Sequence, residues 1–317
     1  MSSSAHLLVP FAACESPASR QAVAGLRLPH LTRLLSRLAP QTLDAGQPHD
    51  LCLPHERVLA RALGLWSDDG RVPWAAWDLR QHGGDPGALA WAWLTPCHWQ
   101  VGRDRVVMAQ PAALQLSEAD SRALLSAMTP FFEEDGLALE WIDSLRWRAR
   151  GAVFADLACA SLDRAAGATV DDWLPRATEA RTVRRLQQEM QMLLYTHPIN
   201  AEREARGLAP VNSFWVGGAG ALPAGLPDAA APPQVDDRLR EPALAHDWAA
   251  WAAAWQQLDA QVLAPLAQAE GTGEPIQLTL CGEKSARTWA TVPTAWHQRL
   301  LRALRRAPAV AQALDPL

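Results

Sequence analysis

The sequence predicts an α/β fold, with a mixed sheet flanked by helices, in one large domain spanning residues 1–317. Strand-like runs and helical spacings of apolar residues are intermingled along the whole chain, which favours a mixed architecture. Hydrophobic residues make up 49% of the 317 residues and charged residues 20%, as expected for a folded globular protein. No internal repeat is visible.

The sequence pattern in the first part of the chain predicts one strand, three helices and a strand pair. The apolar run "HLLVPFA" (6–12) suits a first strand, and Ser16 followed by Pro17 fits the entry of a helix. Residues 90–110 read as two strands joined at "GRD". Leu, Val and Ala recur at helical spacing in three segments: 17–25, 29–38 and 54–65.

A capped helix and a hairpin follow. Ser117 is the N-cap of a helix that runs to about Glu134, with Asp120 at the capping-box position. Apolar residues alternate with polar ones through 137–150, which predicts a hairpin. One face of its second strand carries Arg146, Arg148 and Arg150. We interpret this face as solvated or paired with carboxylates; an anion-binding stripe is the alternative.

The second part of the chain begins with a helix over 178–195, which ends near His197 because Pro198 disfavours helix in the residue before it. A Pro-, Ala- and Asp-rich stretch at 221–242 predicts a long surface connection. The Trp stripe of the next helix, near 246–266, is interpreted as core, with a ligand or partner groove as the alternative. The last predicted elements are a strand and turn at 276–285 and a basic helix at 294–306.

Composition excludes several function classes. The net charge of −5 lacks the basic face that sequence-independent nucleic-acid binding needs. The N-terminal segment has no basic region before its apolar run, and no stretch approaches the roughly 20 apolar residues of a membrane span. Five cysteines without a CxxC pair are expected to be buried small hydrophobes in a reducing compartment. We therefore expect a cytoplasmic protein that binds neither nucleic acid nor membrane.

One short polar segment, residues 195–223, "YTHPINAEREARGLAPVNSFWVGGAGALP", is the main candidate for a binding site. Asn200 is placed to cap the turn "AEREAR", on which Arg203 and Arg206 share a side. Asn212 enters a strand, and the glycines after it would allow a tight turn and close approach to an anion. The alternative is a purely structural turn. The predicted ligand-binding residues are Asn200, Arg203, Arg206, Asn212, Gly217, Gly218 and Gly220.

Other candidate sites are weaker. Asp78 and His82, four residues apart, and the nearby Asp85 could hold a metal ion, and so could the cluster "HDLCLPHE" (49–56), but both also fit ordinary loop and helix-start chemistry. Cys281 ends an apolar strand beside Lys284, whose charge would lower the pKa of the thiol and make it a catalytic candidate. A buried structural cysteine is the alternative.

The chain also resembles known proteins. Three stretches, "LTPCHWQVGRDRVVMA", "EMQMLLYTHPIN…VNSFWVGGAG" and "LTLCGE", are similar to bacterial RpfE-type regulatory proteins, often labelled phosphoglycerate mutase-like. The middle stretch resembles archaeal-type cofactor-independent phosphoglycerate mutases, where Pro-x-Asn-x-x-Arg leads into Pro-x-Asn and a Gly-x-Gly turn. The resemblance implies a core like that of alkaline phosphatase.

The mutases transfer phosphate through a nucleophilic Ser or Thr beside two divalent metals held by Asp and His. Where the family has Asp-Gly after the first strand, this chain has "AACESPAS", and near its end "TLCGEKSART" stands in place of the Asp and His ligands. The resemblance therefore implies a non-catalytic regulatory or ligand-sensing protein with no cofactor, which binds a small phosphorylated ligand or a protein partner.

Two alternatives remain open. One is a phosphomutase or phosphatase that uses Mn or Zn through ligands not recognised in the sequence. The other is a protein-interaction module that uses a Trp- and Arg-bearing surface.

Overall fold

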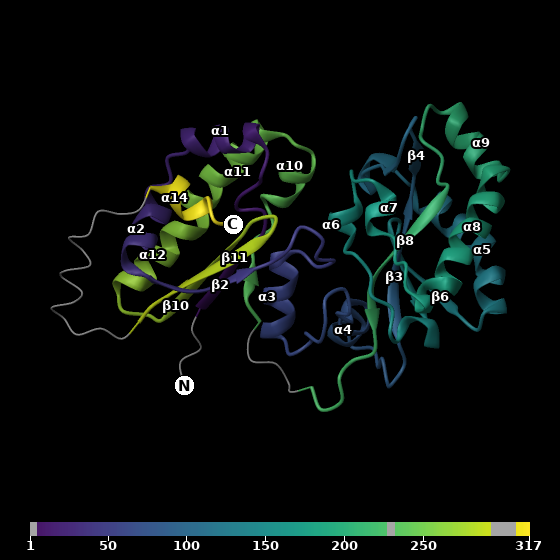
Figure 1. The fold of residues 1–317 in the computed structure, drawn as a ribbon, viewed down its shortest axis with the longest axis horizontal. Coiled ribbons are helices and arrows are strands. Elements are labelled where there is room, and N and C mark those ends of the chain that lie inside the picture. Colours follow the sequence, from purple (N-terminus) through teal and green to yellow (C-terminus); the bar gives the residue numbers. More distant parts are fainter. Residues whose placement is uncertain (1–4, 227–231, 293–308) are drawn as a thin grey trace. The chain divides into compact units, whose positions relative to one another are not determined.

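The computed structural model describes residues 5–226, 232–292 and 309–317. Within them the chain forms two compact units (Figure 1), where the sequence predicts one large domain. Unit 1 is built from Met1–His49, Leu53–Leu63 and Asp228–Leu317 as far as these are described, and unit 2 from Asp50–Cys52 and Gly64–Pro227. Each unit has its own sheet and its own apolar core, as is usual when a chain outgrows a single core.

Unit 1 contains a five-stranded mixed sheet in the order β2-β11-β10-β1-β9. Strand β1 runs parallel to β10 and β9, whereas β11 runs antiparallel to β10 and β2. The strands are β1 (Ala5–Val9), β2 (Ala39–Ala45), β9 (Gln234–Val235), β10 (Ile276–Cys281) and β11 (Ser285–Ala290). The described helices are α1 (Pro17–Gly25), α2 (Pro29–Arg37), α3 (Pro54–Ala62), α10 (Arg240–Leu244), α11 (Trp248–Leu258), the π-helical turn η4 (Asp259–Leu263), α12 (Ala264–Gly271) and α14 (Val310–Leu314).

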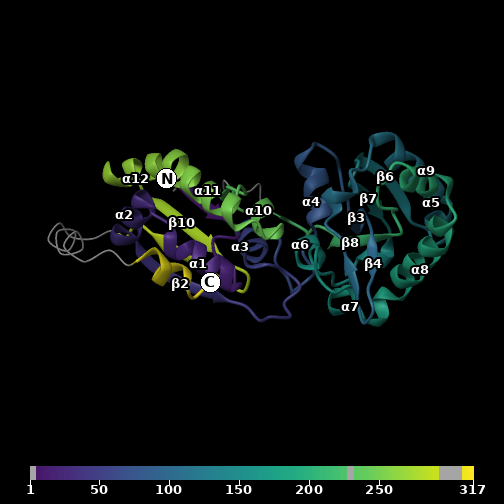
Figure 2. The ribbon, with the colours of Figure 1, turned by 90° about the horizontal axis from the view of Figure 1, so that it is seen from above.

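Helices cover both faces of this sheet, as Figures 1 and 2 show. On one face Leu7 and Leu278 belong to a core shared with α1, α2, α11 and α12. On the other face Leu8 and Cys281 pack against Val58 and Leu59 of α3. The alternation follows from the period of two in a strand. The prediction of a mixed sheet flanked by helices is confirmed.

The Trp stripe of α11 lies in the core of unit 1. Trp251 and Trp255 are fully buried, and Trp248 and Trp255 each contact Trp251 edge to face. The helix does not continue regularly to residue 266, because η4 interrupts it. Asp259 in this turn is itself buried and accepts the amides of His30 and Leu31, so it caps α2, which has no side-chain cap of its own.

His6 makes the stability of unit 1 sensitive to acid. Its Nε2 lies 2.8 Å from the Thr279 hydroxyl, and burial lowers the pKa of the imidazole below its usual value of 6.5. The unfolded chain therefore binds the proton first, and stability is lost as pH falls from about 6.5 through the folded-state pKa. We expect His6→Gln to lose less stability than the wild type between pH 7.5 and pH 5. Thermal denaturation across this range measures the difference; parallel curves for the two proteins would contradict it.

Unit 2 contains a four-stranded antiparallel sheet in the order β6-β7-β3-β8 and a ribbon of β4 and β5. The strands are β3 (Trp91–Cys97), β4 (Trp99–Val101), β5 (Val106–Met108), β6 (Ala138–Asp143), β7 (Arg146–Arg150) and β8 (Ser213–Gly220). The helices are α4 (Trp74–Gln81), η1 (Pro111–Leu114), α5 (Glu118–Glu134), η2 (Ala152–Phe154), α6 (Leu162–Ala165), α7 (Val170–Trp173), η3 (Thr178–Ala180), α8 (Arg181–Tyr195) and α9 (Pro198–Ala205).

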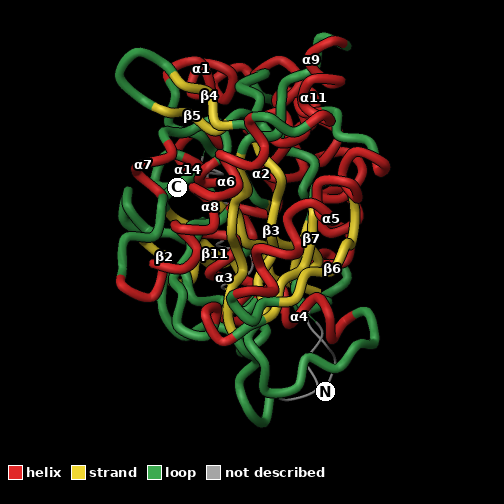
Figure 3. Tube along the Cα trace, turned by 90° about the vertical axis from the view of Figure 1, so that its right-hand side faces the viewer, coloured by secondary structure: helices red, strands yellow, loops and turns green. Residues whose placement is uncertain are grey.

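The core of unit 2 lies between its sheet and the pair α5 and α8, whereas α4 packs on the opposite face (Figures 1 and 3). Ser117 accepts the amide of Asp120 at the start of α5, and the predicted hairpin forms as β6 and β7. The arginine face of β7 is partly paired with carboxylates: Arg148, nearly fully buried, binds Glu140 and Asp78.

Two predicted segments differ from the structure or fall partly or wholly outside the described residues. The predicted connection at 221–242 contains β9 and the start of α10, and residues 227–231 within it are not described. The predicted basic helix at 294–306 also lies outside the described residues. Among those that are described, no helix is both long and apolar enough to cross a membrane.

Candidate functional site

The predicted ligand-binding arginine, Arg203, lies in the interior of unit 2. It is fully buried in α9. Its Nε and Nη2 donate to the carbonyl of Ala209, Nη2 also donates to the carbonyl of Leu114, and Nη1 lies 3.3 Å from a carboxylate oxygen of Asp120. Arg206, half exposed, binds the same oxygen at 3.0 Å. Arg203 thus joins η1, α5 and the chain after α9.

The aspartate between these arginines is held in its charged form. Burial raises the pKa of Asp120, but hydrogen bonds from Arg206, Arg203 and Ser117 and the charge of Arg206 outweigh it, so the pKa lies below its usual value. The carboxylate therefore compensates the two arginines at neutral pH. Neither arginine faces one of the described cavities.

The two asparagines bind backbone. Asn200 is buried within α9: its Nδ2 donates to the carbonyls of Leu194 and Val211, and its Oδ1 accepts the amide of Val211. The cap of α9 is His197, whose ring nitrogen accepts the amide of Ile199, so the prediction of Asn200 as a cap is wrong. The side chain of Asn212 bonds both backbone groups of Trp99.

The three glycines lie inside β8, where the sequence predicts a turn after the strand. Gly218 has φ +60°, and a Cβ there would lie 2.9 Å from the Cβ of Trp74. Gly220 stands close to Pro73 in the same way. Their lack of a side chain allows the start of α4 to pack directly on β8. Gly217 continues the strand opposite Trp93.

The candidate metal ligands already have other partners. Asp78 binds Arg148, and the ring of His82 lies 2.8 Å from the Asp78 carbonyl. Asp85 accepts the amide of Gly87. In the 49–56 cluster, Glu56 accepts the amide of Leu53 to close a capping box. Within the described residues, no three His, Cys, Asp or Glu side chains are grouped so that they could hold a metal ion.

The catalytic candidate Cys281 is fully buried, and burial raises the pKa of its thiol, with a further contribution from the charge of Asp44. This direction is opposite to the one expected from the neighbouring lysine. Lys284 instead binds Glu15, with 2.6 Å between Nζ and Oε1. The thiol of Cys281 is therefore protonated at neutral pH.

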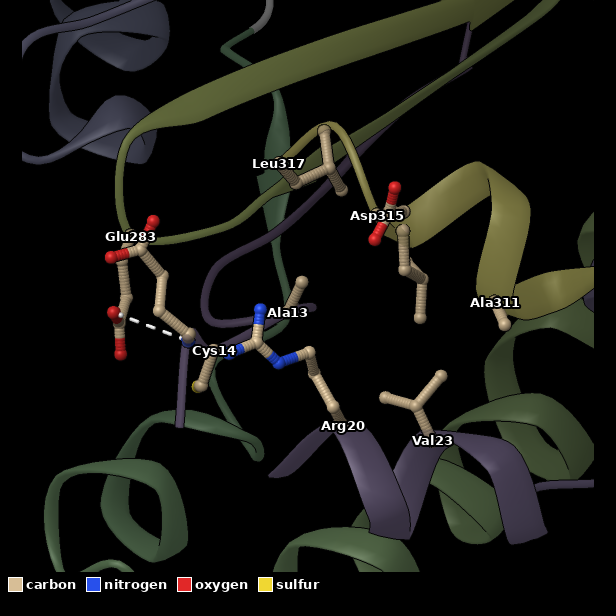
Figure 4. A pocket seen from close by; sticks show the side chains of 10 residues that line it. Ala13, Cys14, Arg20, Val23, Glu283, Ala311, Asp315 and Leu317 are labelled. Carbon is tan, nitrogen blue, oxygen red and sulfur yellow. Dashed lines mark hydrogen bonds between the residues drawn. The ribbon is translucent and has the colours of Figure 1, made fainter. Parts of the chain in front are cut away.

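A cavity of about 190 Å³ lies at the carboxyl ends of the parallel strands β1 and β10 in unit 1 (Figure 4). We call it the strand-end cavity. In open α/β sheets this edge is the usual place for a ligand, since loops and helix starts converge there. It is lined by Ala13, Cys14, Glu15, Arg20, Val23, Glu283, Ala311, Leu314, Asp315 and Leu317.

The loop after β1 forms the floor of this cavity. The amide of Ala12 donates to the carbonyl of Cys281 at 2.7 Å, which prolongs the contact between β1 and β10. Phe11 adopts a left-handed backbone conformation with φ +54°, rare for a bulky residue, and its carbonyl accepts the indole of Trp251 at 3.0 Å. The core helix α11 thereby fixes the shape of the loop.

Helix α1 begins at the rim of the cavity. Ser16 accepts the amide of Ser19, and the hydroxyl of Ser19 donates to the carbonyl of Cys14 at 2.6 Å. These bonds hold Cys14 at the entry of the helix and orient Arg20, one turn further, towards the cavity (Figure 4).

The opposite wall comes from the turn between β10 and β11 and from the segment after Ala309. Leu317 packs against Gly282, where any Cβ would lie 2.5 Å from Leu317 backbone atoms, so this contact requires glycine. The carbonyl of Leu317 accepts the amides of Lys284 and Ser285. This contact places Asp315 and Leu314 beside the strand ends.

The acidic and thiol groups at the strand ends bind one another. Burial raises the pKa of Cys14, and the charge of Glu283 and a hydrogen bond to it raise the pKa further. Glu283 also accepts the amide of Glu15 at 3.3 Å. Among the described residues at the strand ends, no three His, Cys, Asp or Glu side chains are grouped so that they could hold a metal ion, so this edge does not fit the metal pair of the mutases.

The strand-end cavity was not predicted from the sequence, in which "AACESPAS" and "TLCGEKSART" were interpreted only as places where metal ligands are lacking. A usable signal was present: both segments follow apolar strands, and the carboxyl ends of parallel strands meet at one edge.

All five cysteines are free and buried. Burial also raises the pKa of Cys97, and that of Cys159 to about 12. Because the thiolate is the reactive form, we expect no cysteine of the native protein to be alkylated by iodoacetamide at pH 8 within minutes. Intact-mass measurement checks this, with the urea-denatured protein as the control in which all five react. Rapid modification of Cys281 in the native protein would restore it as a catalytic candidate.

No family model matches the sequence, and no curated protein matches it either. Solved structures do show similarity. The cofactor-independent phosphoglycerate mutase from Thermoplasma acidophilum is 14% identical over 98% of this chain and 99% of that chain, with a TM-score of 0.39. A protein from Pyrococcus horikoshii is 11% identical over 98% of this chain and 92% of that chain, with a TM-score of 0.45.

Proposed function

We propose that this chain is a non-catalytic ligand-sensing protein on a phosphoglycerate mutase-like scaffold, and that its ligand binds in the strand-end cavity. One observation carries the proposal. The cavity lies where an α/β sheet ordinarily binds its ligand, yet within the described residues it holds no group of His, Cys, Asp or Glu side chains arranged to hold a metal ion. Such a site supports binding without a metal-activated nucleophile.

We infer a regulatory role for this ligand-sensing protein from the resemblance of its sequence to RpfE-type regulatory proteins. Free, buried cysteines fit a reducing compartment, which supports a cytoplasmic location. The segment 195–223, the ligand site predicted from the sequence, has a structural role in this proposal, because Asn200 and Arg203 use their donors within unit 2.

Activity and binding assays together test the proposal. The protein is incubated with 2- and 3-phosphoglycerate and with p-nitrophenyl phosphate in the presence of Mg²⁺, Mn²⁺ or Zn²⁺. We expect no turnover above the blank. Metal-dependent turnover would contradict the proposal and favour the phosphomutase or phosphatase alternative.

A library of small metabolites is then screened by thermal shift. A ligand at 100 times its dissociation constant adds about 2.7 kcal/mol to the free energy of unfolding. We expect Ala311→Trp, which fills the cavity from α14, to abolish the shift. Gln312→Trp, on the same helix but outside the lining, should preserve it. If both variants keep the shift, the ligand binds elsewhere.

A further inference from the structure

The charged groups of the strand-end cavity do not all neutralise one another. Glu15 is paired with Lys284, and Glu283 binds the Glu15 amide and the Cys14 thiol. Arg20 and Asp315, in contrast, form no ion pair within the described part of the chain, although both line the cavity. In Figure 4 Arg20 projects from α1 between Glu283 and Asp315.

The remaining walls are apolar and the space is small. Val23 of α1 and Leu314 of α14 face the cavity, together with Ala13 and Ala311. The cavity volume is about 190 Å³, which suits a small-molecule ligand.

The net charge of the lining disfavours a phosphorylated ligand. Glu15, Glu283 and Asp315 supply three carboxylates to the lining and Arg20 supplies a cation, while Lys284, outside the lining, pairs with Glu15. A phosphate monoester, which carries nearly two negative charges at neutral pH, would be repelled by the carboxylates of the lining. A ligand with one positive and one negative group matches the two unpaired side chains.

We propose that the strand-end cavity binds a small zwitterion, an α-amino acid with an apolar side chain, whose carboxylate pairs with Arg20 and whose ammonium group pairs with Asp315 and Glu283. The apolar side chain lies against Val23 and Leu314. This inference rests on the proposed function, since it assigns the ligand class of the same site. A guanidinium binds a carboxylate through two parallel hydrogen bonds, which explains why an arginine suits the anionic end.

Isothermal titration calorimetry of the full-length protein tests the ligand class. The probes are L-leucine, isoamylamine, which lacks the carboxylate, and 4-methylvalerate, which lacks the ammonium group. We expect L-leucine to bind and each truncated probe to bind at least tenfold more weakly. Inorganic phosphate and 3-phosphoglycerate are included to test the anionic alternative.

Substitutions at two exposed positions test which charged group of the ligand each side chain binds. Arg20→Gln should weaken L-leucine binding at least tenfold and leave isoamylamine unaffected. Asp315→Asn should weaken L-leucine and isoamylamine and leave 4-methylvalerate unaffected. Arg27→Gln, an exposed arginine just past α1 and outside the cavity lining, is the matched control and should bind as the wild type does.

The outcomes separate this inference from the proposed function. Binding of phosphate or 3-phosphoglycerate without turnover, and none of L-leucine, overturns the zwitterion and leaves a ligand-sensing protein. Equal binding of all three probes, or of none, also overturns the zwitterion. Metal-dependent turnover in the separate activity assay overturns the proposed function itself.

Discussion

Arg203→Ala is expected to lower the free energy of unfolding of unit 2 by about 3–5 kcal/mol, the cost of removing one partner from a buried charged network. The guanidinium is fully buried and holds the carbonyls of Leu114 and Ala209 as well as Asp120. Alanine leaves both carbonyls without this donor and opens a space that the neighbouring side chains fill only in part.

Hydrogen exchange measured by mass spectrometry resolves this effect by region. Peptides from β7 and α8 in unit 2 should lose protection in the variant, whereas peptides from β1 and α11 in unit 1 should not. Arg206→Ala is the matched control: it removes an arginine from the same aspartate, but its side chain is half exposed. An exposed pair contributes at most about 1 kcal/mol. Equal effects of the two substitutions would mean that the burial of Arg203 does not determine its contribution to the free energy of unfolding of unit 2.

This expectation reverses what the sequence suggests for Arg203. Within a short Asn- and Arg-rich segment, an arginine beside glycines resembles an anion site. Its decisive contact, with the carbonyl of Leu114, joins residues 89 apart in the chain. No local pattern reports such a contact, because helix spacing and turn chemistry depend only on near neighbours.

Helices and strands whose ends are set by neighbouring residues were predicted correctly from the sequence. The Ser117 cap, the hairpin of β6 and β7 and the end of α8 before Pro198 each follow from residues a few positions apart. The glycines of β8 show the limit of this approach. Their spacing predicts a turn, but the approach of α4, more than a hundred residues earlier in the chain, keeps them in a strand.

The strand-end cavity likewise depends on contacts between distant parts of the sequence, which local patterns indicate only in part. Two of its charged side chains come from opposite ends of the sequence: Arg20 lies in α1, and Asp315 directly follows α14. Only the parallel pairing of β1 with β10 and the contact of Leu317 with Gly282 bring these ends of the sequence together. The sheet of unit 1 thus supplies the site by its topology.

The second large effect is expected in unit 1. Trp251→Ala should lower the free energy of unfolding of unit 1 by about 3–5 kcal/mol, as is typical when a buried aromatic residue is truncated in a core. Trp251 is fully buried between Trp248 and Trp255. Trp248→Ala, at a partly buried position of the same helix, is the control and should cost less. Similar losses from both substitutions would contradict the assignment of Trp251 to the centre of this core.

Trp251→Phe separates packing from the hydrogen bond. Phenylalanine keeps an aromatic ring in the core but removes the indole donor that holds the Phe11 carbonyl. The left-handed conformation of Phe11 is strained and persists only while its surroundings impose it. We therefore expect Trp251→Phe to retain most of the protection of α11 against hydrogen exchange while the loop from Phe11 to Cys14 exchanges faster. Since this loop is the floor of the strand-end cavity, ligand affinity should fall with it. Unchanged exchange in the loop would show that the bond to Phe11 does not shape the site.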